Sequence, residues 1–346
     1  HFEPRDEEYR LRFRVDGVLQ EVLRPPLNLS PAITSRLKML ASLDISEKRL
    51  PQDGRFSLKV GSREIDLRVS TLPTAFGEKV VLRILDKSSL VMGVDQLGLS
   101  EQEKNDFRCL MDLPYGLLLV TGPTGSGKTT TLYSMLQYLN SPRKNIVTVE
   151  DPVEYHFADI NQTQVNPRVD LTFSRGLRAI LRQDPDVIMV GEIRDDETAS
   201  IAVRAALTGH LVLSTMHTND AVSSIGRLID MGVKPYLLSS SLVGVIAQRL
   251  VRRVCTDCVR YEDPDPVLLK RWEIDPAVIE RWAVPRGCST CNRTGYKGRK
   301  AIFEILRVDE SLRTMILQSE SSVSIRQAAR ARGLSSLRSA GIRRSE

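Results

Sequence analysis

The sequence predicts an α/β protein with a mainly parallel sheet covered by helices on both faces, preceded by a smaller α+β domain. Three observations predict this class. The 346 residues are enough for two or three cores. Period-two alternation dominates residues 5–86, and from about Leu97 apolar strand-length runs alternate with helical patterns. A glycine-rich turn joins one such strand to a helix, as in a phosphate-binding loop.

The first region, residues 1–86, is expected to be a small α+β domain. A hairpin is predicted by YRLRFRVDGVLQEV, with its turn at Asp16-Gly17. A helix is predicted by SPAITSRLKMLASL, with Ser30 as N-cap and Pro31 in the first turn. More strands follow in RFSLKVGSREIDLRVS and EKVVLRIL, and the polar stretch 87–98 is expected to be a linker.

Residues 99–252 are expected to form the α/β core with its parallel sheet. Its predicted strands are 117–120, 146–149, 186–190 and 211–215, and each ends in polar or charged residues. Ligands of open α/β sheets bind beyond the carboxyl ends of the strands, so these four polar clusters are expected to converge on one site.

The first cluster is the motif G-x-x-x-x-G-K-T. Its glycines let backbone N–H groups turn inward around phosphates, Lys128 supplies a positive charge, and the Thr129 hydroxyl can reach Mg²⁺. The motif predicts binding of ATP or GTP. Its nucleotide-binding residues are Gly122, Pro123, Thr124, Gly125, Ser126, Gly127, Lys128, Thr129 and Thr130.

The other clusters offer candidate catalytic residues. Glu150 in TVEDPVEY is a candidate for orienting or deprotonating the attacking water. Glu192 in DVIMVGEIRD has the form of a Walker B acid, although Gly191 stands where an Asp is usual, so action through a water is favoured over direct metal ligation. His217 follows the last strand and can reach a phosphate. For His210 a structural role and a functional role are almost equally favoured. The sequence leaves open which glutamate is the base.

Phosphoryl transfer also needs positive charge on the departing phosphates. Arg68 and Arg83 lie on predicted strands of the first domain, where an arginine more often decorates a solvated face than serves a site.

Two C-x-x-C pairs mark residues 253–298 as an insert. They predict tetrahedral structural Zn²⁺, and a redox or disulfide role is the weaker alternative. The four cysteines are Cys255, Cys258, Cys288 and Cys291. Residues 299–346 are expected to be helical. From Arg293 onward there are twelve Lys and Arg against five Asp and Glu, which suits solvated helix faces or a contact with an acidic partner.

Composition excludes several classes. No apolar stretch approaches the ~20 residues of a membrane span, and no signal peptide is apparent. The chain is therefore expected to be soluble and cytosolic, and its start at His1 suggests a fragment. An aromatic content of 5% without basic-aromatic repeats argues against binding nucleic acid.

Taken together, the motifs resemble those of the ATPases of type II secretion and type IV pilus assembly. The resemblance runs from about residue 5 to residue 305 and includes LPQDGR, TLPTAFGEKVVLRILD, LRAILRQDPDVIMVGEIRD and AQRLVRRVC. The sequences TTTLYSML and NPRVDLTF and the four cysteines look closest to the type II secretion branch, with pilus assembly a near second.

The resemblance implies a cytoplasmic homo-hexameric ATPase that drives pseudopilus assembly and protein export. It also implies that residues 1–86 are a PAS-like domain and that residues 99–252 are a RecA-like ATPase core. Its cofactors would be ATP, Mg²⁺ and Zn²⁺. Its catalytic positions fall on Glu150, Glu192 and His217, with arginines from the first domain at Arg68 and Arg83. Its partners would be the inner-membrane platform and cytoplasmic-domain proteins of the machine, which would hold it peripherally at the inner membrane. The family has a further N-terminal domain, which this fragment is expected to lack.

Two other classes stay open. A RecA-like nucleic-acid motor fits the basic C-terminal region, and a nucleotide-binding scaffold would bind without turnover. DNA-stimulated hydrolysis would favour the first. The second is disfavoured because every acid and histidine that hydrolysis needs is present.

Overall fold

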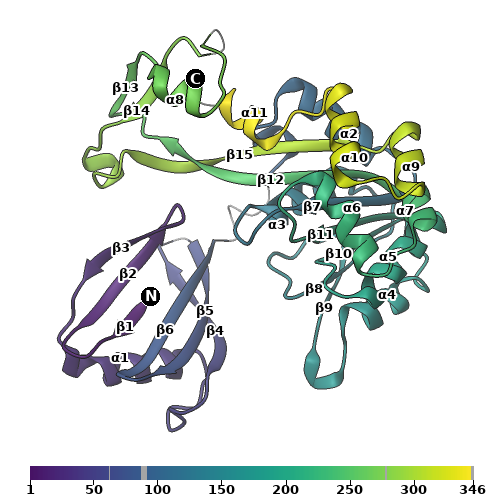
Figure 1. The fold of residues 1–346 in the computed structure, drawn as a ribbon. Coiled ribbons are helices and arrows are strands. Elements are labelled where there is room, and N and C mark those ends of the chain that lie inside the picture. Colours follow the sequence, from purple (N-terminus) through teal and green to yellow (C-terminus); the bar gives the residue numbers. More distant parts are fainter. Residues whose placement is uncertain (62, 87–91, 277–278, 344–346) are drawn as a thin grey trace. The chain divides into compact units, whose positions relative to one another are not determined.

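The computed structural model describes residues 1–61, 63–86, 92–276 and 279–343 (Figure 1). The chain forms two compact units, His1–Leu90 and Val91–Glu346. Each unit is described by itself.

The first unit is an antiparallel sheet with one packed helix. Its strand order is β3-β2-β1-β6-β5-β4. The helix packs over Val69 and Val80 through Leu37 and Ala41. The strands are β1 (Phe2–Pro4), β2 (Tyr9–Val15), β3 (Val18–Leu23), β4 (Gln52–Val60), β5 (Arg63–Thr74) and β6 (Gly77–Asp86), with the 3-10 turn η1 (Leu27–Leu29) and helix α1 (Ser30–Leu40).

Two predicted local features of this unit have different outcomes. Asp16 and Gly17 both have positive φ, +49° and +85°, so the β2–β3 hairpin turns where the sequence indicates. The prediction of Ser30 as N-cap is wrong. The turn η1 runs directly into α1, so the Ser30 N–H already donates to the Leu27 carbonyl and Ser30 has helical dihedrals.

The second unit is built on a seven-stranded sheet of order β15-β12-β7-β11-β10-β8-β9. All neighbouring strands are parallel except β15, which runs antiparallel to β12 at one edge. The strands are β7 (Gly116–Thr121), β8 (Ile146–Glu150), β9 (Asn161–Gln164), β10 (Val187–Val190), β11 (Leu211–Met216), β12 (Leu242–Val254) and β15 (Tyr296–Arg307).

Helices cover both faces of this sheet, as strand β7 illustrates. Leu117 and Leu119 enter one core together with α4, α5, α6, α7, α9 and α10. Leu118 and Val120 enter the other with α2 and α3. The helices are α2 (Glu101–Met111), α3 (Lys128–Leu139), α4 (Phe173–Ile180), α5 (Asp196–Leu207), α6 (Ala221–Asp230), α7 (Pro235–Ser241), α9 (Glu310–Leu317) and α10 (Ser322–Ala331). The predicted α/β class, with a mainly parallel sheet covered on both faces, is confirmed.

Strands β12 and β15 extend beyond the sheet as a two-stranded ribbon that ends at the cysteines. Register pairs run from Gly244 with Arg307 to Val254 with Tyr296. The ribbon carries an insert made of strand β13 (Val259–Glu262), helix α8 (Pro266–Arg271), strand β14 (Trp282–Pro285) and the 3-10 turn η6 (Ser289–Cys291).

Two boundaries differ from those predicted. Residues 299–307, assigned from sequence to a helical region, belong to β15, and helices follow only from α9 to α11 (Leu337–Ile342). Within the stretch predicted as a linker, Val94 and Leu97 form the 3-10 turn η3 (Val94–Leu97) and are buried in the core of the second unit. A further 3-10 turn, η4 (Pro167–Val169), precedes α4.

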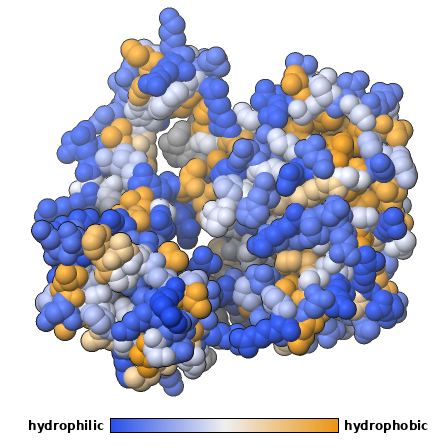
Figure 2. All heavy atoms as spheres, turned by 60° about the horizontal axis from the view of Figure 1, so that its bottom comes forward, coloured by the Kyte–Doolittle hydropathy of each residue, from blue (hydrophilic) through white to orange (hydrophobic). Residues whose placement is uncertain are grey.

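Among the described residues, no helix combines the length and apolar character that crossing a membrane requires. The face drawn in Figure 2 is mostly hydrophilic, with scattered groups of hydrophobic residues.

Candidate active site

The loop between β7 and α3 has the shape of a phosphate nest. Gly122, Gly125 and Gly127 have φ of +152°, +78° and +90°. A Cβ at Gly122 would lie 2.5 Å from the Gln248 carbonyl oxygen, and one at Gly127 would lie 2.8 Å from Gln248 Nε2. Gln248 on β12 is buried, and its Oε1 accepts a hydrogen bond from the Thr131 hydroxyl at 2.7 Å. At these two positions the backbone and β12 together leave room only for glycine.

The loop residues fit a nucleotide. Lys128 Nζ is buried and donates to the carbonyls of Gly122 and Pro123, at 2.8 and 3.1 Å, so the ammonium lies inside the loop. Burial lowers the pKa of Lys128, and the charge of Glu192 opposes this shift. Ser126 Oγ is buried without a hydrogen-bond partner. An inward amine and an unsatisfied hydroxyl are donors that phosphate oxygens would satisfy.

Glu192 and His217 lie next to each other beyond the ends of β10 and β11. His217 Nε2 is 3.6 Å from Glu192 Oε2, and Arg194 also pairs with the Glu192 carboxylate. Burial lowers the pKa of His217 below its usual 6.5, and the charge of Lys128 lowers it further. His217 is therefore neutral at pH 7, beside a carboxylate that interacts electrostatically with the phosphate-loop lysine.

Glu150, the last residue of β8, lies in a closed hydrogen-bond network. Its side chain is 3% exposed. Oε2 accepts from the Tyr133 hydroxyl at 2.6 Å, and Oε1 accepts from Thr148 at 2.6 Å and from Gln162 at 3.0 Å. Both carboxylate oxygens are thus held by protein donors.

Arg68 and Arg83 form a cross-strand pair in the first unit. They lie opposite each other in the β5–β6 register, Arg68 half-buried and Arg83 exposed. The other predicted catalytic residues all belong to the second unit.

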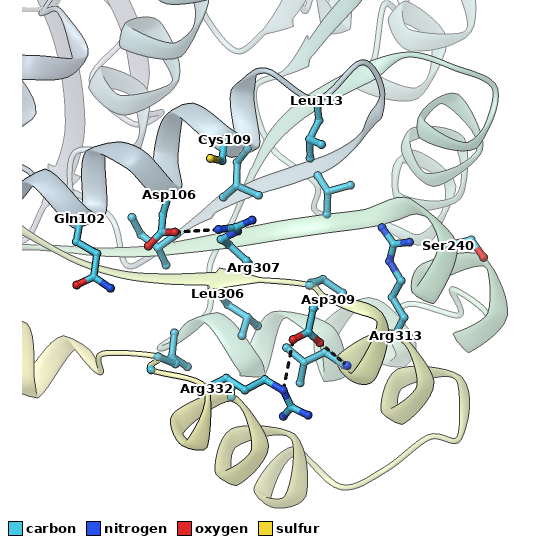
Figure 3. A pocket seen from close by; sticks show the side chains of 18 of the residues that line it. Gln102, Asp106, Cys109, Leu113, Ser240, Leu306, Arg307, Asp309, Arg313 and Arg332 are labelled. Carbon is cyan, nitrogen blue, oxygen red and sulfur yellow. Dashed lines mark hydrogen bonds and ion pairs between the residues drawn. The ribbon is translucent and has the colours of Figure 1, made fainter.

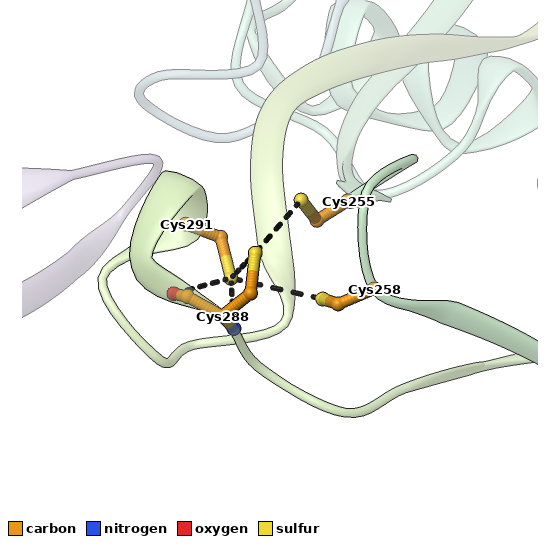
Figure 4. A group of neighbouring side chains, drawn as sticks. All are labelled: Cys255, Cys258, Cys288 and Cys291. Atoms are coloured by element: carbon orange, nitrogen blue, oxygen red, sulfur yellow. Dashed lines mark hydrogen bonds between the residues drawn. The ribbon is translucent and has the colours of Figure 1, made fainter.

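The cysteines of the insert form one cluster (Figure 4). The Sγ–Sγ distances are 3.9 Å, 3.8 Å and 3.7 Å for the pairs Cys255–Cys288, Cys258–Cys291 and Cys288–Cys291. A tetrahedral Zn²⁺ with Zn–S bonds of about 2.3 Å requires Sγ–Sγ distances of about 3.8 Å, whereas a disulfide requires about 2.05 Å. The geometry fits zinc.

Backbone N–H groups point at two of these sulfurs. Cys288 N and Gly295 N each lie 3.2 Å from Cys291 Sγ, and Gly287 N lies 3.2 Å from Cys258 Sγ. The N–H of Cys288 contributes most to lowering the pKa of Cys291 to about 6, while burial raises the pKa of Cys258 to about 11. The donors at Cys291 favour the thiolate form that a metal binds.

A cavity of about 600 Å³ lies near the amino ends of β7 and β12, whereas the phosphate loop follows the carboxyl end of β7 (Figure 3). Arg307 on its wall pairs with Asp106, and Arg332 pairs with Asp309. None of the predicted site residues lines it.

The comparison with protein families decides where the chain belongs. The model of the family described as "Type II/IV secretion system protein" matches residues 1–346. The chain belongs to this family.

Relatives in the family carry names from both branches. "Type II secretion system protein E" of Pectobacterium carotovorum subsp. carotovorum is 54% identical over 327 residues, which are 94% of this chain and 65% of that protein. "Type II secretion system ATPase E" of Vibrio cholerae serotype O1 is 55% identical over 91% of this chain and 63% of its own length. "Type IV pilus assembly ATPase PilB" of Myxococcus xanthus is 52% identical over 99% of this chain and 62% of its own length. The chain thus spans slightly less than two thirds of each of these relatives.

Solved structures agree with the fold. The pilus retraction motor PilT, solved with bound ADP, matches with a TM-score of 0.59 at 27% identity, covering 95% of this chain and 88% of that one. The Legionella pneumophila ATPase DotB matches with a TM-score of 0.62 at 21% identity, covering 98% and 84%. The family resemblance inferred from the sequence is confirmed.

The sequence analysis missed the partners of Glu150 and of the glycine loop. Tyr133, Thr148 and Gln162 surround the carboxylate, and Gln248 fills the space behind the loop. The sequence contains one weak indication of these partners, because Thr148 is a polar residue inside an otherwise apolar strand.

Proposed function

We propose that this chain is the ATP-hydrolysing part of a hexameric motor that powers pseudopilus assembly and protein export in type II secretion. The observation that carries the proposal is that Glu192 and His217 lie together beside a phosphate loop with an inward Lys128. The names of the relatives from Pectobacterium and Vibrio supply the secretion role.

In this proposal the phosphate loop, residues 122–130, holds the nucleotide through its N–H groups and Lys128. Mg²⁺, bound through the Thr129 hydroxyl, would neutralise charge on the β- and γ-phosphate oxygens. Glu192 accepts a proton from the water whose oxygen attacks the γ-phosphorus, while the bond to the β-phosphate oxygen breaks and ADP and phosphate form. His217, neutral at pH 7, orients the Glu192 carboxylate. Glu192 is the better candidate for the base because Glu150 is 3% exposed and held by three donors, whereas the Glu192 side chain is 13% exposed and its partners Arg194 and His217 are open to solvent.

The first unit would complete the site. Arg68 and Arg83 lie side by side on β5 and β6, so one movement of the PAS-like domain, residues 1–86, could deliver both guanidinium groups to the phosphates. Such an arrival by domain motion predicts low activity in an isolated subunit.

The cysteine cluster would hold a structural Zn²⁺ in the insert, residues 253–298. Four thiolate ligands leave no open position for catalysis, and the metal would fix the end of the β12–β15 ribbon.

The alternative within the family is type IV pilus assembly, which the 52% identical Myxococcus relative favours. In either branch we propose a cytoplasmic location at the inner membrane, held by the platform and cytoplasmic-domain proteins of the machine, with no nucleic acid as partner. The test between branches is complementation of a secretion-deficient and a pilus-deficient strain with a full-length chimera that carries these residues.

The first experiment measures ATP hydrolysis against protein concentration for the chain, for Glu192→Gln and for the matched control Glu197→Gln. Glu197 is an exposed glutamate on α5 paired with Arg178. We expect turnover that rises cooperatively with concentration, is unchanged by single-stranded DNA and by the control, and falls at least 100-fold in Glu192→Gln. Stimulation by DNA would instead support a nucleic-acid motor, and nucleotide binding without turnover at any concentration would support a scaffold.

A further inference from the structure

The inference concerns Tyr133, a tyrosine on helix α3 that contacts both Glu150, at the end of β8, and the segment 151–160 that follows it. Its side chain is fully buried. The hydroxyl donates to Glu150 Oε2 at 2.6 Å and accepts the backbone N–H of Glu154 at 3.0 Å. Burial and the neighbouring Glu150 charge raise the pKa of Tyr133, so the hydroxyl keeps its proton and can donate.

The same tyrosine holds the segment through its ring. The Tyr133 ring packs edge-on against Phe157 with centroids 5.4 Å apart, and Phe157 packs in the same way against Tyr155 at 5.2 Å. Residues 151–160, which connect β8 to β9, therefore have a polar and an apolar attachment to α3. Helix α3 is also the helix whose first residue is Lys128 of the phosphate loop.

Gln162, on β9, also forms hydrogen bonds with the segment 151–160. Its Nε2 donates to Glu150 Oε1 and to the Tyr155 carbonyl, both at 3.0 Å, and its Oε1 accepts the Phe157 N–H at 2.9 Å. Glu150 is thus the common acceptor for a residue on α3 and a residue on β9, and both residues also form hydrogen bonds with the backbone of the segment 151–160.

This arrangement does not suit a general base. A base must reach the proton of the attacking water within about 2.6–3.2 Å. Glu150 accepts three hydrogen bonds from buried or half-buried donors and is 3% exposed. Releasing it to meet a water would leave the hydroxyls of Tyr133 and Thr148 without their acceptor, and unpaired buried polar groups are costly.

We propose that Tyr133 and Glu150 form a positioning pair, which fixes the segment 151–160 against the phosphate-loop helix and thereby sets the geometry of the hydrolytic site. The pair connects helix α3, whose first residue is Lys128, to the segment 151–160. This inference rests on the proposed function, because it assigns roles within the same ATPase site and leaves Glu192 as the base.

The test compares Tyr133→Phe, Glu150→Gln and the double variant with Tyr138→Phe as the matched control. Tyr138 lies on the same helix, but its hydroxyl bonds to Asp112 at the surface. Tyr133→Phe keeps the ring contact with Phe157 and removes only the hydroxyl. We expect kcat to fall about tenfold in Tyr133→Phe while the KM for Mg-ATP stays within about twofold, because the phosphate loop itself is unchanged.

Two further readouts separate positioning from a general loss of structure. The double variant Tyr133→Phe/Glu150→Gln should lose no more activity than the worse single variant, since both changes break one interaction. Amide hydrogen exchange of the peptide that contains Glu154 should accelerate in Tyr133→Phe and stay unchanged in Tyr138→Phe. Should Tyr133→Phe fail to fold, Gln162→Ala removes a donor to the same carboxylate from a half-buried position and should lower kcat in the same way.

The outcomes distinguish the inference from the proposed function. A loss of 1,000-fold or more in Glu150→Gln, with Tyr133→Phe unaffected, would make Glu150 the base and overturn the positioning pair alone. Wild-type activity in Glu192→Gln would overturn the proposed site, and the inference with it.

Discussion

Replacing Gly127 by alanine tests the phosphate loop quantitatively, because Gly125 provides a control in the same loop. Both glycines have positive φ, +90° and +78°. A side chain in the left-handed region costs about 1–2 kcal/mol. A Cβ at Gly125 meets nothing within 4 Å, whereas one at Gly127 would lie 2.8 Å from Gln248 Nε2.

The magnitudes follow from these contacts. Gly125→Ala carries only the backbone cost, which lowers nucleotide affinity by up to about 5- to 30-fold, the limit in which the free loop relaxes and must return to this conformation to bind. Gly127→Ala must in addition displace the Gln248 amide and break its hydrogen bond with Thr131, a further cost of about 0.5–1.5 kcal/mol. The total predicts up to about 10- to 400-fold weaker binding in the same limit.

The assay is titration with a fluorescent ATP analogue, with the melting temperature of each variant recorded alongside. Adding Gln248→Ala to each variant completes a double-mutant cycle. Gln248→Ala should recover part of the affinity lost in Gly127→Ala, because the clash is removed, and none of that lost in Gly125→Ala. Equal losses in Gly125→Ala and Gly127→Ala, or equal recovery in both, would refute the steric argument.

Three further predictions concern metal, pH and stability. Cys258→Ser and Cys291→Ser should each abolish stoichiometric zinc measured by elemental analysis, while Cys109→Ser, at an exposed cysteine outside the cluster, should retain it. Hydrolysis should fall as the pH drops through the pKa of His217, which burial lowers below its usual 6.5, because an imidazolium then forms beside Lys128; an identical acid limb in His217→Gln would contradict this origin. In the first unit, Arg12 lowers the pKa of Glu3 to about 2, so Glu3→Gln should reduce the free energy of unfolding by about 2 kcal/mol at pH 7. That difference should disappear between pH 4.5 and about 2, because the stabilisation is lost as the wild-type carboxylate is protonated; urea unfolding at each pH measures it.

Local signals in the sequence predicted the parts of the fold that local interactions determine. The phosphate loop, the Asp16-Gly17 turn and the apolar runs that become strands each depend on residues close together in the chain. The spacing of the cysteines likewise predicted a cluster that the structure brings within 4.8 Å.

Features that depend on distant partners were not predictable in this way. The sequence around Glu150 resembles that around a catalytic carboxylate. Only the fold reveals that the hydroxyl of Tyr133, on helix α3, donates a hydrogen bond to one of its oxygens. Residues 299–307 contain alternating and continuous apolar positions, so their pairing with β12 decides that they form a strand. Ser30 is a residue type common at N-caps, but the turn η1 precedes it directly, so Ser30 already lies inside the helix.

The ribbon of β12 and β15 has a consequence for insertions and deletions. Gln248, which contacts the phosphate loop, and Cys255, at the metal cluster, are joined by strand β12, whose pairing with β15 shifts register once, between Arg252 and Val254. Because successive side chains alternate in direction along the regular stretch before this shift, adding or deleting one residue there would turn one of the two sites to the wrong side of the ribbon. A change in ribbon length that preserves both sites must therefore add or remove residues two at a time on each strand, in steps of about 7 Å.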